Sequence, residues 1–297
     1  MKVSVIIPAY YRPKDLIDLF ESLLRQTVKP LEVIVVDDTP TDVIESVCET
    51  YYNRFKKFDI KLAYVRNHKE PSLTIARNIG VSIAKGDVIL FLDNDVVLHT
   101  DYIEKVLEVF NNNPNALGVQ GWFDLGIATR GHIYTRRHHI INTLRKIFYL
   151  PNFGIREVKR YKIFEYPLTL QKVKRCESLK GSNMAFKSIV FKEFQFDENL
   201  LKYSYGEDTL FSHSIHRKYP NSLYITPYAK CIHKISEEGR VKASTFEHPY
   251  LRVCRKYVLM KLFGVKGLII FGWQTLGLLA LSISRKIWRF IKNNRNQ

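Results

Sequence analysis

Two carboxylates interrupt the most apolar stretch of the sequence. Residues 88–98 read VILFLDNDVVL, so Asp93, Asn94 and Asp95 divide a run that is otherwise suited to burial on both faces. If extended geometry persists to Asp95, the two aspartates project to the same side, because side chains alternate along a strand. Such a pair would suit a hard divalent cation such as Mg2+ or Mn2+. Asp and Asn also favour turns, so the tripeptide alone leaves both interpretations open.

A second acidic pair, Glu207 and Asp208, follows Gly206 in YGEDT and begins the helical pattern TLFSHSIHRK. Carboxylates at this position complement the helix dipole and serve as caps. One of them could instead act as a general base that accepts the proton of an attacking hydroxyl group. The residues alone do not decide between capping and catalysis.

The elements that position these acids form an alternating pattern. Four apolar runs predict strands at residues 3–8, 31–36, 61–65 and 88–92, and amphipathic patterns predict helices at 13–26, 41–55, 73–86 (with Gly86 as its stop signal) and 101–110. Continuous apolar strands separated by helices indicate an α/β fold with a mostly parallel sheet flanked by helices. Ligands of such sheets bind beyond the carboxyl ends of the strands. Those ends carry Pro8, Ala9 and Tyr10, then Asp37 and Asp38, and then Asp93, Asn94 and Asp95.

Composition narrows the class of protein. The 297 residues are 46% hydrophobic, enough for a sizeable core, and the net charge of +17 favours an anionic partner. The four cysteines have no metal-binding spacing and indicate buried thiols in a reducing compartment. The first apolar run is too short for a signal peptide, so we expect the catalytic part to stay in the cytosol.

Five segments occur in an order that resembles the family 2 inverting glycosyltransferases of the GT-A fold. They are VSVIIPAYYRPKDLIDLFESLLRQT, LEVIVVDDTPTD, ARNIGVSIAKGDVILFLDNDVVL, GSNMAFK and YGEDTLFSHSIHRK, and the resemblance extends over residues 2–235. It implies a Rossmann-like sheet and transfer of a sugar from a nucleoside diphosphate sugar to an acceptor hydroxyl, with inversion by a metal-assisted single displacement. No Q-x-x-R-W element follows the acidic pair, which favours transfer of a single sugar over polymerisation.

The resemblance also implies roles for individual residues. The nucleotide-sugar site would comprise Pro8, Ala9, Tyr10, Arg12, Asp37, Asp38, Arg77, Asp93 and Asn94. Asp93, Asp95 and His233 would hold Mn2+ or Mg2+, Asp208 would be the catalytic base, and Glu207 would contact the acceptor or support the structure. Without the resemblance, Arg77 would be interpreted as a solvated helix charge and His233 as a structural histidine.

The resemblance and the composition together divide the chain into three parts. Residues 1–119 would form the half that binds the sugar donor, residues 120–250 a connection (120–175) and the acceptor-binding, catalytic half of the same domain, and residues 251–297 a hydrophobic, basic helical tail.

The tail predicts association with a membrane. Residues 267–284 carry no charge and are long enough to be considered for a span, but the basic residues that follow them oppose translocation. Five apolar residues fall largely on one helix face, namely Ile283, Ile287, Trp288, Phe290 and Ile291. We therefore expect in-plane or re-entrant attachment to an anionic cytoplasmic leaflet, beside a glycan or lipid-linked acceptor, with a span or a buried helix as alternatives.

Two other functions share some of these features. A nucleotidyltransferase that makes nucleotide sugars would begin with a glycine-rich phosphate loop, whereas PAYYRPKD contains no glycine. A non-catalytic basic protein that binds membranes or nucleic acid would explain the charge but not the acids at the strand ends. We therefore predict an enzyme without a nucleic-acid partner.

Overall fold

The computed structural model describes residues 1–123, 143, 147–148, 152–153, 164–165, 170–202, 204–234 and 249–294, with the side chains of the last helix described up to Ile283. Most of the expected connection, residues 120–175, therefore lies outside the described residues. The chain forms two compact units: Met1–Leu125 with Thr169–Lys242, and Gly126–Leu168 with Ala243–Gln297. The division into functional parts at residues 119 and 250 stays a prediction.

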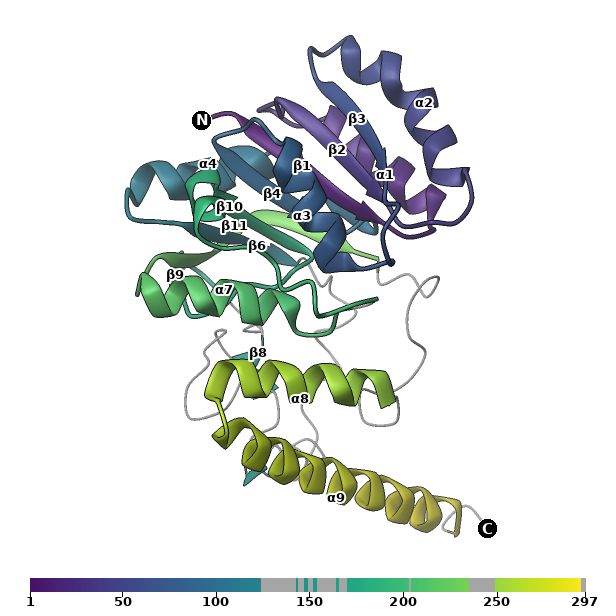
Figure 1. The fold of residues 1–297 in the computed structure, drawn as a ribbon, viewed down its shortest axis with the longest axis vertical. Helices are drawn as coiled ribbons and strands as arrows, with labels where there is room; N and C mark the ends of the chain where they lie inside the picture. Colours follow the sequence, from purple (N-terminus) through teal and green to yellow (C-terminus); the bar gives the residue numbers. More distant parts are fainter. Residues whose placement is uncertain are drawn as a thin grey trace. The chain divides into compact units, whose positions relative to one another are not determined.

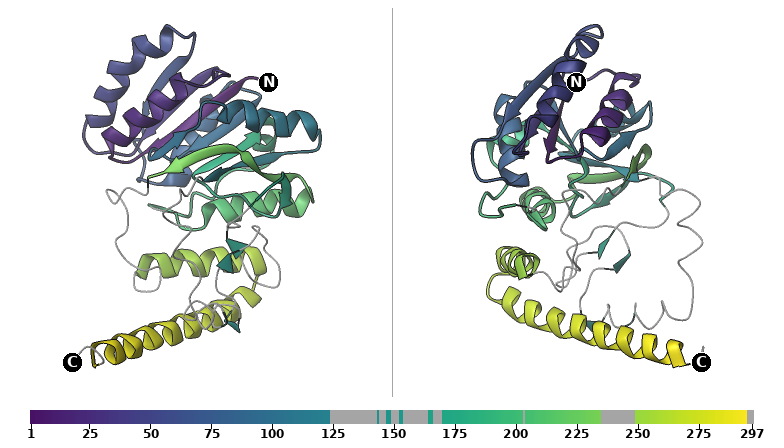
Figure 2. Two further views of the ribbon diagram at one scale, coloured as in Figure 1. Left: turned by 180° about the vertical axis from the view of Figure 1, so that it is seen from behind. Right: turned by 90° about the vertical axis from the view of Figure 1, so that its right-hand side faces the viewer.

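The first unit consists of a sheet and the helices on both of its faces (Figures 1 and 2). Its strands are β1 (Val3–Ala9), β2 (Glu32–Asp37), β3 (Lys61–Arg66), β4 (Val88–Leu92), β5 (Val96–Leu98), β6 (Gly118–Phe123), β9 (Lys174–Cys176), β10 (Asn183–Lys187) and β11 (Leu223–His233). Its helices are α1 (Pro13–Leu24), α2 (Val43–Lys56), α3 (Leu73–Ile83), α4 (Tyr102–Asn112) and α7 (Glu207–Lys218), with the 3-10 helix η1 (Ser188–Lys192).

All four cysteine side chains of the protein are buried thiols.

Among the described residues, the strands of this sheet follow the order β3-β2-β1-β4-β10-β6-β11-β5, with β9 paired to β11. Strands β1 to β4 run parallel, whereas β10 lies antiparallel between β4 and β6. All residues of β2 and β4 are buried, as their continuous apolar sequences require. The prediction of an α/β fold with a mostly parallel, helix-covered sheet is confirmed.

The expected stop of α3 at Gly86 was wrong. The helix ends at Ile83, and Ala84 already has extended backbone angles. Gly86 lies against β1 instead: its N–H donates to Ser4 Oγ at 2.8 Å, and a Cβ at this position would lie 2.5 Å from the Ser4 nitrogen. The glycine therefore allows a close approach to the sheet and does not cap the helix.

The strand predicted at residues 88–92 is confirmed as β4, but extended geometry does not persist to Asp95. The strand ends at Leu92, and the N–H of Val96 donates to the Asp93 carbonyl at 3.2 Å, which closes a turn. The chain then enters the short strand β5, which pairs antiparallel with β11. A turn, and not strand alternation, sets the relative positions of the two aspartates.

The second unit contains the C-terminal helices α8 (Pro249–Phe263) and α9 (Lys266–Asn294) and the two-residue strands β7 (Asn152–Phe153) and β8 (Phe164–Glu165), which confirms the predicted helical tail. Lys266–Ile283 is long and apolar enough to cross a membrane, judged by length and composition alone. Its exposed apolar side chains are Leu268, Ile269, Trp273, Leu276, Leu279 and Ile283. The side chains of Ile287, Trp288, Phe290 and Ile291 lie outside the described residues.

Candidate active site

Asp93, Asp95 and His233 form a cluster beyond the carboxyl end of β4. One ligand atom from each lies within 4.8 Å of the others, and His233 Nε2 is 3.0 Å from Asp95 Oδ1. The sequence produces this arrangement because β11 pairs with β5, with His233 opposite Val96, directly after the aspartate turn. Burial raises the pKa of Asp93, and the charge of Asp95 adds to the rise, although Arg77 lowers it. Two carboxylates and an imidazole fit a divalent cation, which would offset their mutual repulsion.

The loop between β1 and α1 contacts the turn that carries this cluster. Arg12 Nη1 lies 3.2 Å from Asp95 Oδ2 and 3.3 Å from Asn94 Oδ1, and Asn94 Nδ2 donates to the Tyr11 carbonyl at 2.9 Å. Tyr11 and Arg12 both have left-handed backbone angles, with φ of 57° and 64°. Two consecutive non-glycine residues in this region are uncommon and indicate a loop whose shape is imposed by its contacts.

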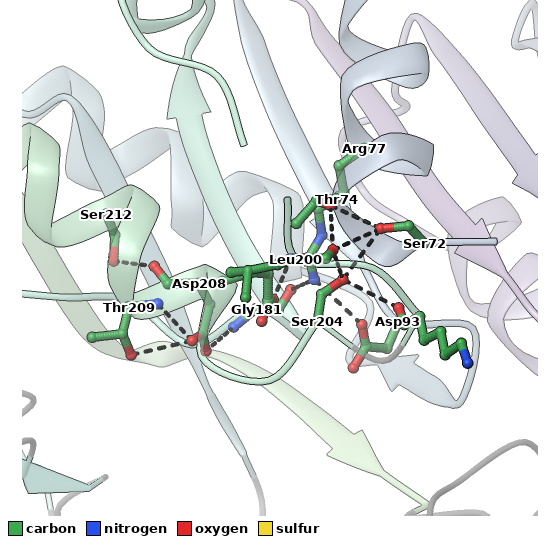
Figure 3. Close-up of polar contacts among 12 residues, drawn as sticks. Ser72, Thr74, Arg77, Asp93, Gly181, Leu200, Ser204, Asp208, Thr209 and Ser212 are labelled. Atoms are coloured by element: carbon green, nitrogen blue, oxygen red, sulfur yellow. Dashed lines mark hydrogen bonds and ion pairs between the residues drawn. The ribbon is translucent and has the colours of Figure 1, made fainter. Parts of the chain in front are cut away.

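Arg77 joins the aspartate turn to the start of α7 (Figure 3). Its guanidinium donates to Glu207 Oε1 and to the Gly181 carbonyl, the latter at 3.1 Å, and lies 3.8 Å from Asp93 Oδ1. Only 1% of the residue is exposed, and the rings of Phe91 and Phe196 lie within 6 Å of the guanidinium carbon. The interpretation of Arg77 as a solvated helix charge was therefore wrong.

Glu207 and Asp208 have different surroundings. Glu207 is buried against Arg77; burial, reinforced by the charge of Asp208, raises its pKa to about 7. Asp208 is half-buried, and its two carboxylate oxygens accept the N–H groups of Gly181 and Thr209. Gly206 permits the turn that precedes them, since its φ is 87°. Of the two acids, Asp208 is the more accessible.

The loop before this acidic pair is held by the N-terminus of α3, as Figure 3 shows. The Leu200 carbonyl accepts hydrogen bonds from the hydroxyls of Ser72, Thr74 and Ser204, at 2.9, 2.9 and 2.6 Å. Lys202 and Ser204 have positive φ angles, as Gly206 does. The hydroxyl cluster thus fixes a strained loop and, through it, the position of Asp208 relative to the first half of the sheet.

Asp37 and Asp38, at the end of β2, also differ. Asp37 is fully buried and accepts hydrogen bonds from the Thr39 N–H and the Tyr64 hydroxyl, at 2.8 and 2.9 Å. Asp38 is half-buried, and its carboxylate accepts the Asn67 amide and the Ser72 N–H, at 2.6 and 3.0 Å. Desolvation nevertheless raises the pKa of Asp38 to about 6.

The remaining predicted residues lie at the end of β1. Pro8 is half-buried, Ala9 is buried, and the Tyr10 side chain is exposed. The structure thus brings together Arg12, Asn94, the aspartates of the turn and His233 in one group, and Arg77, Glu207 and Asp208 in a second, joined by the contact between Arg77 and Asp93. Asp37 and Asp38 contact neither group through any described hydrogen bond.

Sequence reasoning did not single out Gly181. Its carbonyl accepts a hydrogen bond from the Arg77 guanidinium, and its N–H donates one to the Asp208 carboxylate. A Cβ at this position would lie 2.8 Å from both Arg77 Nη2 and Glu207 Oε1. The segment GSNMAFK carried part of the family resemblance, but nothing in it distinguished a glycine that must pass between two charged side chains.

The sequence profile of glycosyl transferase family 2 matches residues 4–173, which is more than half of the chain. The chain belongs to glycosyl transferase family 2. An uncharacterized glycosyltransferase of Haemophilus influenzae is 36% identical to it over 113 residues, covering 38% of this chain and 36% of that protein. Glycosyltransferase GlyA of Streptococcus pneumoniae is 23% identical over 224 residues, covering 75% of this chain and 29% of that protein. The matches thus span about a third of the length of these relatives.

Solved structures show the same fold. This family 2 glycosyltransferase superposes on GalNAc-T7 with UDP, GalNAc and Mn2+ with a TM-score of 0.60 at 16% identity, covering 86% of this chain and 48% of that one. For residues 1–349 of Staphylococcus aureus TarS in complex with UDP-GlcNAc, the TM-score is 0.57 at 16% identity, and the superposition covers 92% of this chain and 71% of that one. The predicted family and the GT-A fold are confirmed. The roles of the individual site residues stay predictions.

Proposed function

We propose that this enzyme transfers a single sugar from a nucleoside diphosphate sugar to an acceptor hydroxyl with inversion at the anomeric carbon. The observation that carries the proposal is the connection between the two acidic groups. Asp93 contacts Arg77, Arg77 contacts Gly181, and Gly181 contacts Asp208. These contacts hold in one framework the residues that we assign to a cation for the diphosphate and the carboxylate that we assign to the attacking hydroxyl.

Asp93, Asp95 and His233 would hold the Mn2+ or Mg2+. Carboxylate and imidazole ligands suit these ions, and the three ligand atoms are close enough to share one. When bound, the cation supplies positive charge that neutralises the departing nucleoside diphosphate. Arg77 keeps Asp93 in place for this role.

Asp208 would be the general base. As the acceptor oxygen bonds to the anomeric carbon, the bond from that carbon to the diphosphate oxygen breaks, and the hydroxyl proton passes to Asp208. The N–H groups of Gly181 and Thr209 each bond to one oxygen of this carboxylate and hold it in a fixed orientation. Glu207 is engaged with Arg77 and would orient the turn that carries Asp208.

The nucleoside would lie along the ends of β1 and β2. The exposed ring of Tyr10 and the half-buried carboxylate of Asp38 are groups that can recognise a base and a ribose. Both carboxylate oxygens of Asp37 already accept hydrogen bonds, from the Thr39 N–H and the Tyr64 hydroxyl, so Asp37 would stabilise this edge of the site through these contacts. UDP in the similar structures supports a uridine nucleotide as the first to test.

The acceptor would be a glycan or lipid-linked molecule at the cytoplasmic face of a membrane. Residues 249–297 contain ten Lys and Arg residues and no Asp or Glu, and α9 exposes the apolar face formed by Leu268, Ile269, Trp273, Leu276, Leu279 and Ile283. A basic helix with one exposed apolar face is typical of a segment that lies in an anionic interface. The similarity to the glucosyl-dolichyl phosphate glucuronosyltransferase of Haloferax volcanii, 30% identical over 123 residues covering 41% of this chain and 38% of that one, supports a lipid-linked acceptor.

The test is a panel of nucleotide sugars incubated with the full-length enzyme and Mn2+, with release of nucleoside diphosphate as the signal. We expect one sugar donor to react, the product to have the inverted anomeric configuration by NMR, and Asp95→Ala to abolish metal-dependent turnover because a charged ligand is lost. Near-normal, metal-dependent turnover of Asp95→Ala would contradict the cation site. Release of pyrophosphate from a sugar phosphate and a nucleoside triphosphate would indicate a nucleotidyltransferase instead.

A further inference from the structure

Both carboxylate oxygens of Asp95 face positively charged or protonatable groups. Oδ2 lies 3.2 Å from the Arg12 guanidinium and Oδ1 lies 3.0 Å from His233 Nε2. Asp95 is fully buried, whereas the Arg12 side chain is 10% exposed. A buried carboxylate is stable only when its charge is compensated, and Arg12 supplies that compensation here.

The same contact opposes the binding of a cation. A divalent ion on Asp95 would lie within a few ångströms of the guanidinium, and at that separation like charges repel strongly inside a protein. Arg12 and a cation therefore compete for Asp95. A cation that binds alone must displace a cationic side chain and leave it without its carboxylate partner.

We propose that Arg12 is a displaceable counter-charge, which bonds to Asp95 while no cation is bound and turns to the diphosphate of the sugar donor when a cation takes its place. The inference rests on the proposed cation site. Guanidinium groups are suited to both positions, because they bond carboxylate and phosphate oxygens with the same planar set of N–H donors.

The contacts around Arg12 are compatible with such an exchange. Arg12 also bonds to Asn94, and Asn94 is anchored to the Tyr11 carbonyl, so the guanidinium stays beside the cluster after it leaves Asp95. The backbone of Asp95 is fixed separately, because its carbonyl accepts the Lys234 N–H at 3.0 Å. The Arg12 side chain can then move while the carboxylate keeps its position.

This exchange makes the binding of cation and nucleotide cooperative. When the cation displaces Arg12 from Asp95, the diphosphate becomes the new partner of the guanidinium, so the displacement no longer leaves Arg12 without an anionic partner. The cation and the nucleotide therefore each raise the affinity for the other. The free enzyme should accordingly bind Mn2+ weakly, and UDP should strengthen that binding.

The experiment measures Mn2+ binding by electron paramagnetic resonance on full-length wild type, Arg12→Gln and Arg25→Gln, with and without UDP. Arg25→Gln is the control, because it removes the same charge from an exposed position at the other end of α1. We expect Arg12→Gln to bind Mn2+ alone about tenfold more tightly than wild type, a factor within the 1–3 pK units by which an adjacent guanidinium changes proton binding to a carboxylate. UDP should raise the Mn2+ affinity of Arg12→Gln by a smaller factor than that of wild type, and Arg25→Gln should match wild type.

Unchanged or weaker binding of Mn2+ alone by Arg12→Gln would overturn the inference. If Arg12→Gln does not fold, as judged by circular dichroism, Arg12→Met keeps the aliphatic stem and is expected to show the same tightening. The variant Asp95→Ala separates the cation site from the role of Arg12. If Asp95→Ala abolishes Mn2+ binding but Arg12→Gln leaves it unchanged, the cation site stands and only the counter-charge role of Arg12 is overturned. Binding that is absent from wild type and Arg12→Gln alike would overturn the cation site as well.

Discussion

At the scale of single residues, the neighbours Asp208 and Glu207 should respond differently to neutral, isosteric substitution. Asp208→Asn can still accept the Gly181 N–H but cannot accept a proton, so turnover should fall by about two to four orders of magnitude while affinity for the sugar donor stays near wild type. Single-turnover kinetics together with calorimetric UDP binding measure the two effects separately. A collapse of nucleotide affinity would instead make Asp208 a binding or structural residue.

Glu207→Gln provides the contrast for that experiment. The substitution removes the carboxylate that lies nearest to the buried Arg77 and leaves only the longer contact with Asp93, and breaking a buried pair from one side is strongly destabilising. We expect the thermal midpoint of Glu207→Gln to fall well below that of Asp208→Asn. Equal midpoints with a larger loss of turnover in Glu207→Gln would transfer the role of base to Glu207.

Asp38 predicts a pH dependence of stability. Its pKa is about 6 in the folded protein against an ordinary value of 3.8, so the folded state retains a proton at pH values where the unfolded chain has released it. The stability that this proton contributes is present at pH 4 and is lost as the pH rises to about 6. The free energy of unfolding of wild type relative to Asp38→Asn should therefore decrease across this window and stay level above it. Urea titrations at pH 4, 5, 6 and 7 measure the difference; a difference that rises with pH would contradict the prediction.

At the scale of elements, Gly181 sits where the approach to β10 passes between Arg77 and the start of α7. Gly181→Ala would place a Cβ 2.8 Å from both Arg77 Nη2 and Glu207 Oε1, so one of these side chains must move. Overpacking of this kind costs roughly 1–3 kcal/mol, and the displaced Asp208 should lower turnover at least about tenfold. Gly272→Ala is the matched control, because its Cβ would meet nothing within 4 Å, and alanine is favoured over glycine inside a helix. Denaturant midpoints and turnover of the two variants test the prediction, which fails if both behave as wild type.

The elements of the first half were predictable because each carries its own periodicity. Apolar runs gave β1 to β4, and acids just beyond them marked the edge where the site lies. The three-residue strand β5 and the antiparallel insertion of β10 were not predictable, since such short segments have no periodicity and their partners lie far away in the sequence. For the same reason the burial of Arg77 was missed: its partners Gly181 and Glu207 lie more than 100 residues further along the chain.

At the scale of the whole molecule, the exposed apolar face of α9 should bind anionic vesicles. The double variant Ile269→Glu with Leu276→Glu should weaken binding to phosphatidylglycerol vesicles at least about tenfold, because burial of one such side chain contributes roughly 1.5–3 kcal/mol. Ile189→Glu, at an exposed isoleucine of η1, is the control for added negative charge and should bind nearly as wild type does. Sedimentation with vesicles is the measurement. A full-length protein that ignores anionic vesicles would refute attachment, and a C-terminus accessible from the outer side of cells would indicate a span.

The position of β10 has a consequence for the synthesis of the protein. β10 fills the space between β4 and β6, yet it is translated about 60 residues after β6 ends. At a translation rate of about 5–20 residues per second, the edge of β6 waits roughly 3–12 s for this partner, and the facing edge of β4, which is translated earlier, waits longer. Unpaired apolar edges of this kind are where chains associate wrongly. Codon changes that slow translation between residues 124 and 182 should therefore lower the yield of soluble enzyme without altering a single amino acid.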